Sequence, residues 1–215
     1  MSHPEDAEDA GDGVEQEHYF TADPSVAFQR SPIEVEVWGE RLGLQTGSGV
    51  FAQGRLDVGT AVLLRETDPP ADLPPGATVL DLGCGYGVLA VALARTTSAR
   101  VVAVDVNERA LLLARENAAA AGVGERVDAR RPEEVDPELR YDEIWSNPPI
   151  RIGKAALHDL LLTWLPRLAP GGRAVLVVGK NLGADSLQRW LGEQGFPAVR
   201  LASAKGFRVL EVRRA

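Results

Sequence analysis

The stretch from Ile144 to Ile150, "IWSNPPI", places one carboxamide, Asn147, between an apolar run and two prolines. Proline cannot donate a hydrogen bond to a sheet, and it restricts the residue before it to extended conformations. The pattern therefore predicts a strand that ends at Ser146 and an Asn147 side chain held firmly just beyond it. A group held in this way is suited to chemistry, although Asn-Pro-Pro is also a common turn.

A second polar position stands beside a glycine-rich turn in "VLDLGCGYG" (79–87). Gly83 and Gly85 allow the backbone to approach a ligand closely, and the helix expected after them offers unpaired N–H groups. The spacing differs from the G-x-G-x-x-G pattern of dinucleotide-binding turns, because the third position is Val88. Asp81, at the end of the preceding strand, is better suited to a cationic amino group than to a pyrophosphate.

A third position, Asp105, ends the next predicted strand. An acid at that place can accept hydrogen bonds from both ribose hydroxyls of an adenosine group, with Val106 and Asn107 beside the ribose and the base. In a doubly wound sheet, ligands bind at the carboxyl ends of neighbouring strands. We therefore expect Asp81 and Asp105 to border one site; the alternative is a pair of surface acids at strand ends.

The elements that must position these residues alternate from residue 78 onward, which predicts an α/β fold with a doubly wound parallel sheet. Two consecutive strands at the C-terminal end indicate that the last strand enters antiparallel, so that the sheet has seven strands. The predicted strands are 78–83, 100–106, 125–130, 141–146, 171–179 and two within 198–214. The predicted helices are 87–97, 107–122, 153–169 (broken or ended near Pro166) and 183–195.

The N-terminal part reads as a short β extension packed on this core. Residues 33–39 alternate as a strand, 42–54 read as a strand, a turn and a return strand, and 56–67 as a helix. A proline-rich connector follows at 68–77. The predicted organisation is an acidic tail (1–17), an N-terminal extension or lid (18–67) and a catalytic core (68–215).

The net charge of −8 comes mostly from the N-terminus, since residues 1–17 hold seven acids and no Lys or Arg. This tail is predicted to be a disordered solubilising segment, with a regulatory arm that mimics nucleic acid as the alternative. The rest of the chain is nearly neutral, so a nucleic-acid-binding surface would have to be a local patch.

Composition also limits the other classes of site. The single cysteine, Cys84, excludes an internal disulfide and a cysteine zinc cluster, and no metal site is predicted. No apolar run is long enough for a membrane span, and the start lacks the features of a signal peptide. A cytoplasmic protein is the resulting expectation.

The motif "DLGCGYG" followed by "VDVN" resembles the cofactor-binding half of class I S-adenosylmethionine-dependent methyltransferases. The resemblance implies that S-adenosyl-L-methionine is the cofactor. It also implies that Asp81, the turn glycines and the residues around Asp105 bind it, with Asn147 at the border. Such enzymes often carry an Asp or Asn after the third strand that reaches the adenine. Arg130 stands there in this chain, so Asp128 or a backbone N–H is expected to substitute.

The "NPP" at the end of the fourth core strand resembles methyltransferases that act on amino groups conjugated to an aromatic ring or a carbonyl. An exocyclic amine is a poor nucleophile because its lone pair is conjugated. The side-chain carbonyl of Asn147 and the backbone carbonyl of Pro148 would both accept its hydrogens and favour a pyramidal nitrogen. Pro148 and Pro149 would hold these acceptors preorganised.

Four further segments, "HYFTADPSV", "GVFAQGRLDVGTAVLL", "SNPPIRIGK" and "GFRVLEV", together resemble the small-domain (MTS) methyltransferases. This group includes bacterial ribosomal RNA guanine-N2 methyltransferases, of which the chain resembles the catalytic half. The resemblance implies a substrate-side set of Phe51, Asp57, Thr60, Ile150, Arg151 and Lys154. Asp57 could instead be only a helix N-cap, Thr60 a helix residue, and Arg151 and Lys154 ordinary surface charges.

The leading hypothesis is methylation of guanine N2 in ribosomal RNA, with the RNA or a ribosomal subunit as partner and the oligomeric state open. A second hypothesis is methylation of a protein glutamine amide or another nucleobase amine. A third is a catalytically silent, RNA-binding assembly factor of the same fold.

Overall fold

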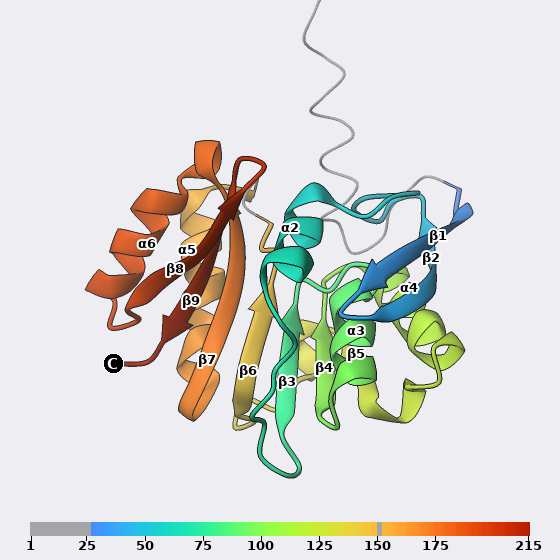
Figure 1. Ribbon diagram of the computed structural model, residues 1–215, viewed down its shortest axis with the longest axis horizontal. Coiled ribbons are helices and arrows are strands. Elements are labelled where there is room, and N and C mark those ends of the chain that lie inside the picture. The colour runs from blue at the N-terminus through green and yellow to red at the C-terminus, as the bar shows by residue number, and fades with distance from the viewer. Residues whose placement is uncertain (1–26, 150–151) are drawn as a thin grey trace, which may run out of the picture.

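The computed structural model describes residues 27–149 and 152–215, and its centre is one seven-stranded sheet (Figure 1). The predicted acidic tail, the "HYFTADPSV" segment, Ile150 and Arg151 lie outside the described residues. The sheet has the order β5-β4-β3-β6-β7-β9-β8. Its strands are β3 (Thr78–Leu82), β4 (Arg100–Val104), β5 (Val127–Arg130), β6 (Tyr141–Ser146), β7 (Leu168–Gly179), β8 (Ala198–Ala204) and β9 (Phe207–Arg213).

The strand directions confirm the predicted doubly wound topology. Strands β3 to β7 pair in parallel, whereas the last strand, β9, runs antiparallel to both β7 and β8. The chain winds outward from β3 through β4 to β5 and then crosses back to β6 on the other side of β3. The switch point lies between β3 and β6, and ligands bind at the carboxyl ends of the strands at such a point.

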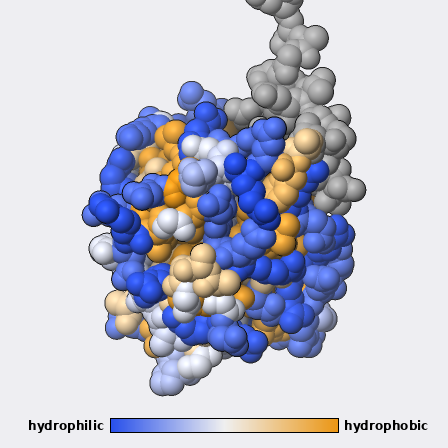
Figure 2. Space-filling view, turned by 90° about the vertical axis from the view of Figure 1, so that its right-hand side faces the viewer, coloured by the Kyte–Doolittle hydropathy of each residue, from blue (hydrophilic) through white to orange (hydrophobic). Residues whose placement is uncertain are grey.

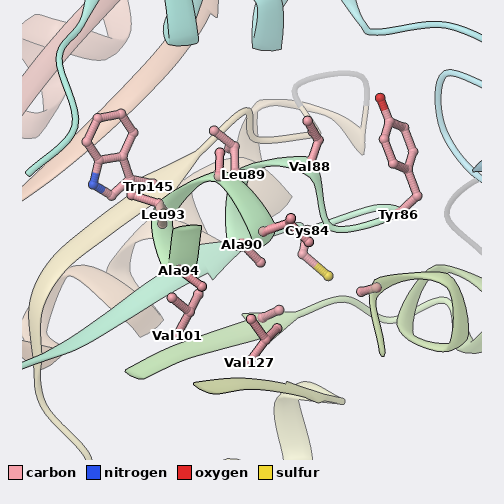
Figure 3. Close-up of a cluster of buried hydrophobic side chains, with 14 of the residues drawn as sticks. Cys84, Tyr86, Val88, Leu89, Ala90, Leu93, Ala94, Val101, Val127 and Trp145 are labelled. Carbon is pink, nitrogen blue, oxygen red and sulfur yellow. The ribbon is translucent and has the colours of Figure 1, made fainter. Parts of the chain in front are cut away.

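Helices cover both faces of the sheet. One face carries α2 (Val58–Glu66), α3 (Val88–Thr96) and α4 (Glu108–Ala120), and the other carries α5 (Lys154–Trp164) and α6 (Ala184–Glu193). Helix α3 is almost completely buried, because the sheet, α4 and the N-terminal hairpin all pack against it. Small residues such as Ala90 and Ala94 permit this close packing (Figure 3). Short 3-10 turns lie between these elements, at Gly124–Arg126, Pro132–Glu134, Leu165–Arg167 and Lys180–Leu182.

The N-terminal extension is a hairpin of β1 (Arg30–Val37) and β2 (Glu40–Gly47) that packs on α4. Trp38 lies in its two-residue turn with a positive φ of 49°. The Trp38 indole N–H donates to the carbonyl of Thr67 (2.7 Å), and its ring meets Trp145 edge to face. Asn117 of α4 holds the backbone N–H and C=O of Gln45 at 2.7 and 2.9 Å. In the view from the side of the hairpin and α4, most of the surface is hydrophilic (Figure 2).

One sequence prediction needs correction. The return strand expected within 42–54 is wrong, because residues 49–55 form successive turns. Gly49, Ala52 and Gly54 there have positive φ values, which are incompatible with a strand. The break expected near Pro166 in the helix 153–169 is confirmed, because the helix ends at Trp164 and a 3-10 turn containing Pro166 leads into β7.

Candidate active site

The glycine-rich turn joins β3 to α3 at the switch point. Gly83, Gly85 and Gly87 all have positive φ (74°, 52° and 86°), a conformation that favours glycine. The N–H groups of Gly83 and Cys84 donate to the carbonyl of Val104 at 2.8 and 2.9 Å, which ties the turn to the end of β4. The backbone thus lies open at Gly83, as a turn that receives a ligand requires.

Asp81 lies completely buried beneath the start of α3. Its Oδ2 accepts a hydrogen bond from the N–H of Ala90 (2.9 Å), which caps a helix whose own N-cap residue, Gly87, has no side chain. Its Oδ1 is buried without a hydrogen-bond partner in the described chain. Burial raises the pKa of Asp81 to about 7. A buried carboxylate oxygen without a donor fits a cationic ligand group at this place.

Asp105 follows β4 and faces the same turn. Its Oδ2 accepts from the N–H of Gly85 and its Oδ1 from the N–H of Asn107, both at 2.9 Å. Burial raises the pKa of Asp105, while these backbone donors act in the opposite direction. Each oxygen keeps a lone pair for a further donor, such as a hydroxyl. The next residue, Val106, is 46% exposed and offers an apolar surface beside the acid.

The neighbouring predicted cofactor residues are placed differently. The Asn107 side chain is buried, accepts from the N–H of Arg109 and donates to the carbonyl of Gly49 (2.6 Å), so it caps α4 and holds the turns at 49–55. Asp128 lies inside β5 and forms a 2.8 Å ion pair with Arg130. The Asp128 carboxylate is therefore already paired with Arg130. The side-chain amide of Asn107 is also engaged, so its backbone is the part that a ligand can contact.

Asn147 directly follows β6, and its orientation is set by α2. The Nδ2 of Asn147 donates to Oδ2 of Asp57 (2.7 Å) and to Oγ1 of Thr60 (3.0 Å). An ionised carboxylate can only accept, so the amide nitrogen must face Asp57, and Oδ1 remains as an acceptor. Asp57 also accepts from the N–H of Thr60 as the N-cap of α2. Asp57 is therefore the N-cap of α2 and also contacts the Asn147 amide.

Gly59 is the point where three elements converge on this amide. An ideal Cβ at Gly59 would lie 3.1 Å from Oδ1 of Asn147, 3.0 Å from Oδ2 of Asp57 and 3.0 Å from the ring of Phe207. A larger residue would push against all three groups. Neither Gly59 nor Phe207 was predicted as a site residue. A glycine in the first turn of a helix was the available signal for Gly59, since glycine there is otherwise unfavourable.

The Asn-Pro-Pro segment also meets the glycine turn. An ideal Cβ at Gly83 would lie 3.8 Å from Cδ of Pro149, and the Ser146 hydroxyl donates to the carbonyl of Leu82 at 2.6 Å. These contacts join the ends of β3 and β6. The site thus combines a buried acid, an acid suited to hydroxyls and an oriented carboxamide along one edge of the sheet.

The sequence model of a family described as "Methyltransferase small domain" matches residues 41–211. The chain belongs to this methyltransferase family. The match includes all the residues that build the site above and most of the described chain.

Two relatives of this methyltransferase small domain match most of the chain. The chain is 29% identical to "Uncharacterized protein YbxB" of Bacillus subtilis (strain 168), covering 92% of this chain and 98% of that protein. It is 37% identical to "Ribosomal RNA small subunit methyltransferase C" of Chromohalobacter salexigens, covering 79% and 51% of the two chains.

A solved structure of an rRNA methyltransferase is also similar to this chain. The chain resembles "T. Thermophilus 16S rRNA N2 G1207 methyltransferase (RsmC) in complex with AdoMet and Guanosine", with a TM-score of 0.71 and 26% identity, covering 90% of this chain and 53% of that one. The chain therefore spans about half the length of both named rRNA methyltransferases.

Two further residues predicted for the substrate side, Phe51 and Lys154, are exposed at the surface. Phe51 is 42% exposed in the turns before α2, and Lys154 is exposed as the first residue of α5. His158 of α5 stacks on Trp190 of α6 with ring centroids 3.5 Å apart. In residues 27–149 and 152–215, no group of three or more His, Cys, Asp or Glu is placed to hold a metal ion. Within the same ranges, no helix is long and apolar enough to cross a membrane.

Proposed function

We propose that this chain transfers a methyl group from S-adenosyl-L-methionine to an exocyclic amino group, namely guanine N2 of ribosomal RNA. The observation that carries the proposal is the Asn147 carboxamide, whose nitrogen is held by Asp57 and Thr60 so that Oδ1 remains to accept. The names of the rRNA methyltransferase relatives, and the guanosine in complex with the T. Thermophilus methyltransferase, support this substrate class.

The residues at the strand ends fit the cofactor. The unpaired Oδ1 of Asp81 suits its ammonium group, Asp105 can accept from its ribose hydroxyls, and the exposed Val106 can pack on its adenine. Bound there, S-adenosyl-L-methionine supplies a methyl group activated by a positively charged sulfur. Asp128 is proposed only as a secondary contact, because Arg130 already binds its carboxylate.

The chemistry that the chain itself performs is the alignment of the amine. Oδ1 of Asn147 and the carbonyl of Pro148 accept the two amine hydrogens, which draws the nitrogen lone pair out of conjugation with the ring. The prolines and the Asp57–Thr60 pair hold these acceptors before the substrate arrives, so little reorganisation is needed during the reaction. No strong base is required, because the amine becomes acidic once methylated and its proton can pass to water.

The test is methyl transfer with labelled cofactor to ribosomal RNA and to ribosomal subunits from a strain that lacks this protein. We expect label on the N2 of one guanine, found by mapping the modified nucleotide, and no label on RNA from the parent strain. Label on protein glutamine would favour the second hypothesis. Cofactor binding without any transfer would favour an assembly role.

The ionisation of Asp81 gives this proposal a pH dependence. A carboxyl whose folded pKa is raised to about 7 is protonated at pH 5.5, and it must lose that proton to bind an ammonium group. Affinity for S-adenosyl-L-methionine should therefore rise about tenfold per pH unit below 7, where the cofactor amino group stays protonated. By the same linkage, the unliganded protein should lose stability as pH rises from about 4 to 7.

Titration calorimetry at pH 5.5, 6 and 7, in two buffers of different ionisation enthalpy, measures both affinity and proton release. We expect release of nearly one proton per cofactor at pH 6 from the parent chain and from the control Asp128→Asn. Asp81→Asn should show none. A flat affinity profile in the parent chain would contradict this role of Asp81.

A further inference from the structure

All three lysines of the chain lie around the carboxyl end of the sheet on the side of β6 to β9. Lys154 begins α5 after β6, Lys180 follows β7, and Lys205 is in the turn between β8 and β9. All three are exposed, and none has an ion pair among the described residues. Of the nineteen arginines in residues 27–149 and 152–215, ten are in ion pairs with carboxylates.

A chain of contacts connects Lys180 and the turn that carries Lys205 to the surroundings of the Asn147 amide. The N–H of Lys180 donates to the carbonyl of Gly206 at 2.7 Å, which joins the end of β7 to the β8–β9 turn. Phe207, the next residue, reaches the same point at Gly59 as Oδ1 of Asn147. The β8–β9 turn rises beside α2 at the upper end of the sheet (Figure 1).

Exposed apolar residues alternate with these cations. Ile152 (37% exposed) precedes Lys154 by two residues, and Leu182 (50%) follows Lys180 by two. Val58, the first residue of α2 next to Asp57, is also 50% exposed. Ammonium groups bind phosphates, and exposed aliphatic side chains can pack against bases and sugars, so this combination is compatible with a single-stranded RNA.

Two acids near these lysines already have partners. Asp185, at the start of α6, is paired with Arg208 and lies near Arg200. Asp57 is engaged with Asn147 and with the start of α2. The cofactor side of the sheet differs, because Arg130 and Arg131 there are bound by Asp128, Glu108 and Glu133. The unpaired positive charge of the lysines therefore lies on the substrate side.

We propose that Lys180 and Lys205, together with Lys154, bind the phosphates of the RNA strand on either side of the target nucleotide. This inference rests on the proposed function, since it assigns the surface that delivers the RNA to Asn147. It also accounts for RNA binding by a nearly neutral domain that spans half the length of the named rRNA methyltransferases. A few unpaired lysines at the site are sufficient for a local electrostatic patch.

The test compares the double variant Lys180→Ala/Lys205→Ala with the control Arg100→Ala/Arg214→Ala. The control removes two exposed charges at the opposite ends of the strands, where β4 begins and just after β9 ends. Binding of a fluorescent rRNA fragment is measured by anisotropy from 50 to 300 mM salt. The lysine variant should bind about tenfold more weakly, and its log–log salt slope should fall by about 1.4, as expected for two lost single-strand phosphate contacts. The arginine variant should match the parent.

Two further measurements separate this inference from the proposed function. Cofactor affinity by calorimetry should be the same in the parent and both variants, and the KM for RNA should rise in the lysine variant while kcat stays within about twofold. If the parent methylates RNA but the lysine variant keeps its affinity and salt slope, only the inference fails. An equal loss in both variants, or no RNA binding by the parent, also overturns it. Methyl transfer by the parent to a target other than RNA would overturn both.

Discussion

The Asn147→Ala variant is expected to lose about 10²–10³-fold in kcat for methyl transfer, with S-adenosyl-L-methionine affinity within about threefold of the parent. The alanine removes an acceptor that is used when the amine nitrogen becomes pyramidal, so the loss should appear in kcat rather than in binding. Single-turnover rates with saturating RNA, and calorimetry with the cofactor, measure the two effects separately.

Asp57 and Thr60 provide graded controls for this result. Asp57→Ala removes the carboxylate that fixes the amide, so Asn147 can turn its NH₂ toward the substrate, and about a tenfold loss in kcat is expected. Thr60→Val removes the weaker of the two contacts and should cost less. If Asn147→Ala kept more than a third of the parental rate, or lost cofactor affinity to the same degree as rate, the assigned role of the amide would be wrong.

The Asp105→Ala variant is expected to weaken S-adenosyl-L-methionine binding by about 10²-fold or more. Hydrogen bonds to a charged group contribute about 1.5–3 kcal/mol each, and the proposed function requires this carboxylate to accept two from a ribose. The same carboxylate orders the N–H groups of Gly85 and Asn107, so the glycine turn also loses support. Calorimetry measures the affinity, and thermal unfolding without cofactor measures the structural part.

Asp128→Ala is the matched control for Asp105, because both acids belong to neighbouring strands on the cofactor side. Its carboxylate is held by Arg130, and a change of less than about threefold in affinity is expected. Asp105→Asn keeps one acceptor and should fall between the parent and the alanine variant. Equal losses in the Asp105→Ala and Asp128→Ala variants would show that general charge, not ribose binding, determines the affinity.

The ends of the core strands could be predicted because local chemistry determines them. Apolar runs followed by Gly83, Asp105 or the Asn147-Pro148 pair mark where each strand stops, and parallel topology brings such ends to one edge. The N-cap at Asn107 was also predictable from its neighbours. The residues proposed to bind the cofactor therefore lie mostly in short segments that can be recognised locally in the sequence.

Contacts between distant segments could not be predicted in the same way. Asp57 and Asn147 are 90 residues apart, and no local pattern indicates that this carboxylate orients this amide. The left-handed conformation of Ala52 gave no signal, so a strand was expected where turns occur. Glu143 and Arg173, paired at 2.8 Å between β6 and β7, also read in sequence only as interruptions of apolar strands.

The 90-residue separation of Asp57 and Asn147 has a consequence for the order of folding. Asp105 and Gly85 are only 20 positions apart, so their contact closes a short loop, whereas the Asp57–Asn147 contact needs β6 and the preceding half of the chain in place. The contact that orients Asn147 therefore forms late in the synthesis and folding of the chain. During synthesis, the residues proposed to bind the methyl donor therefore come together before the pair proposed to orient the acceptor amine.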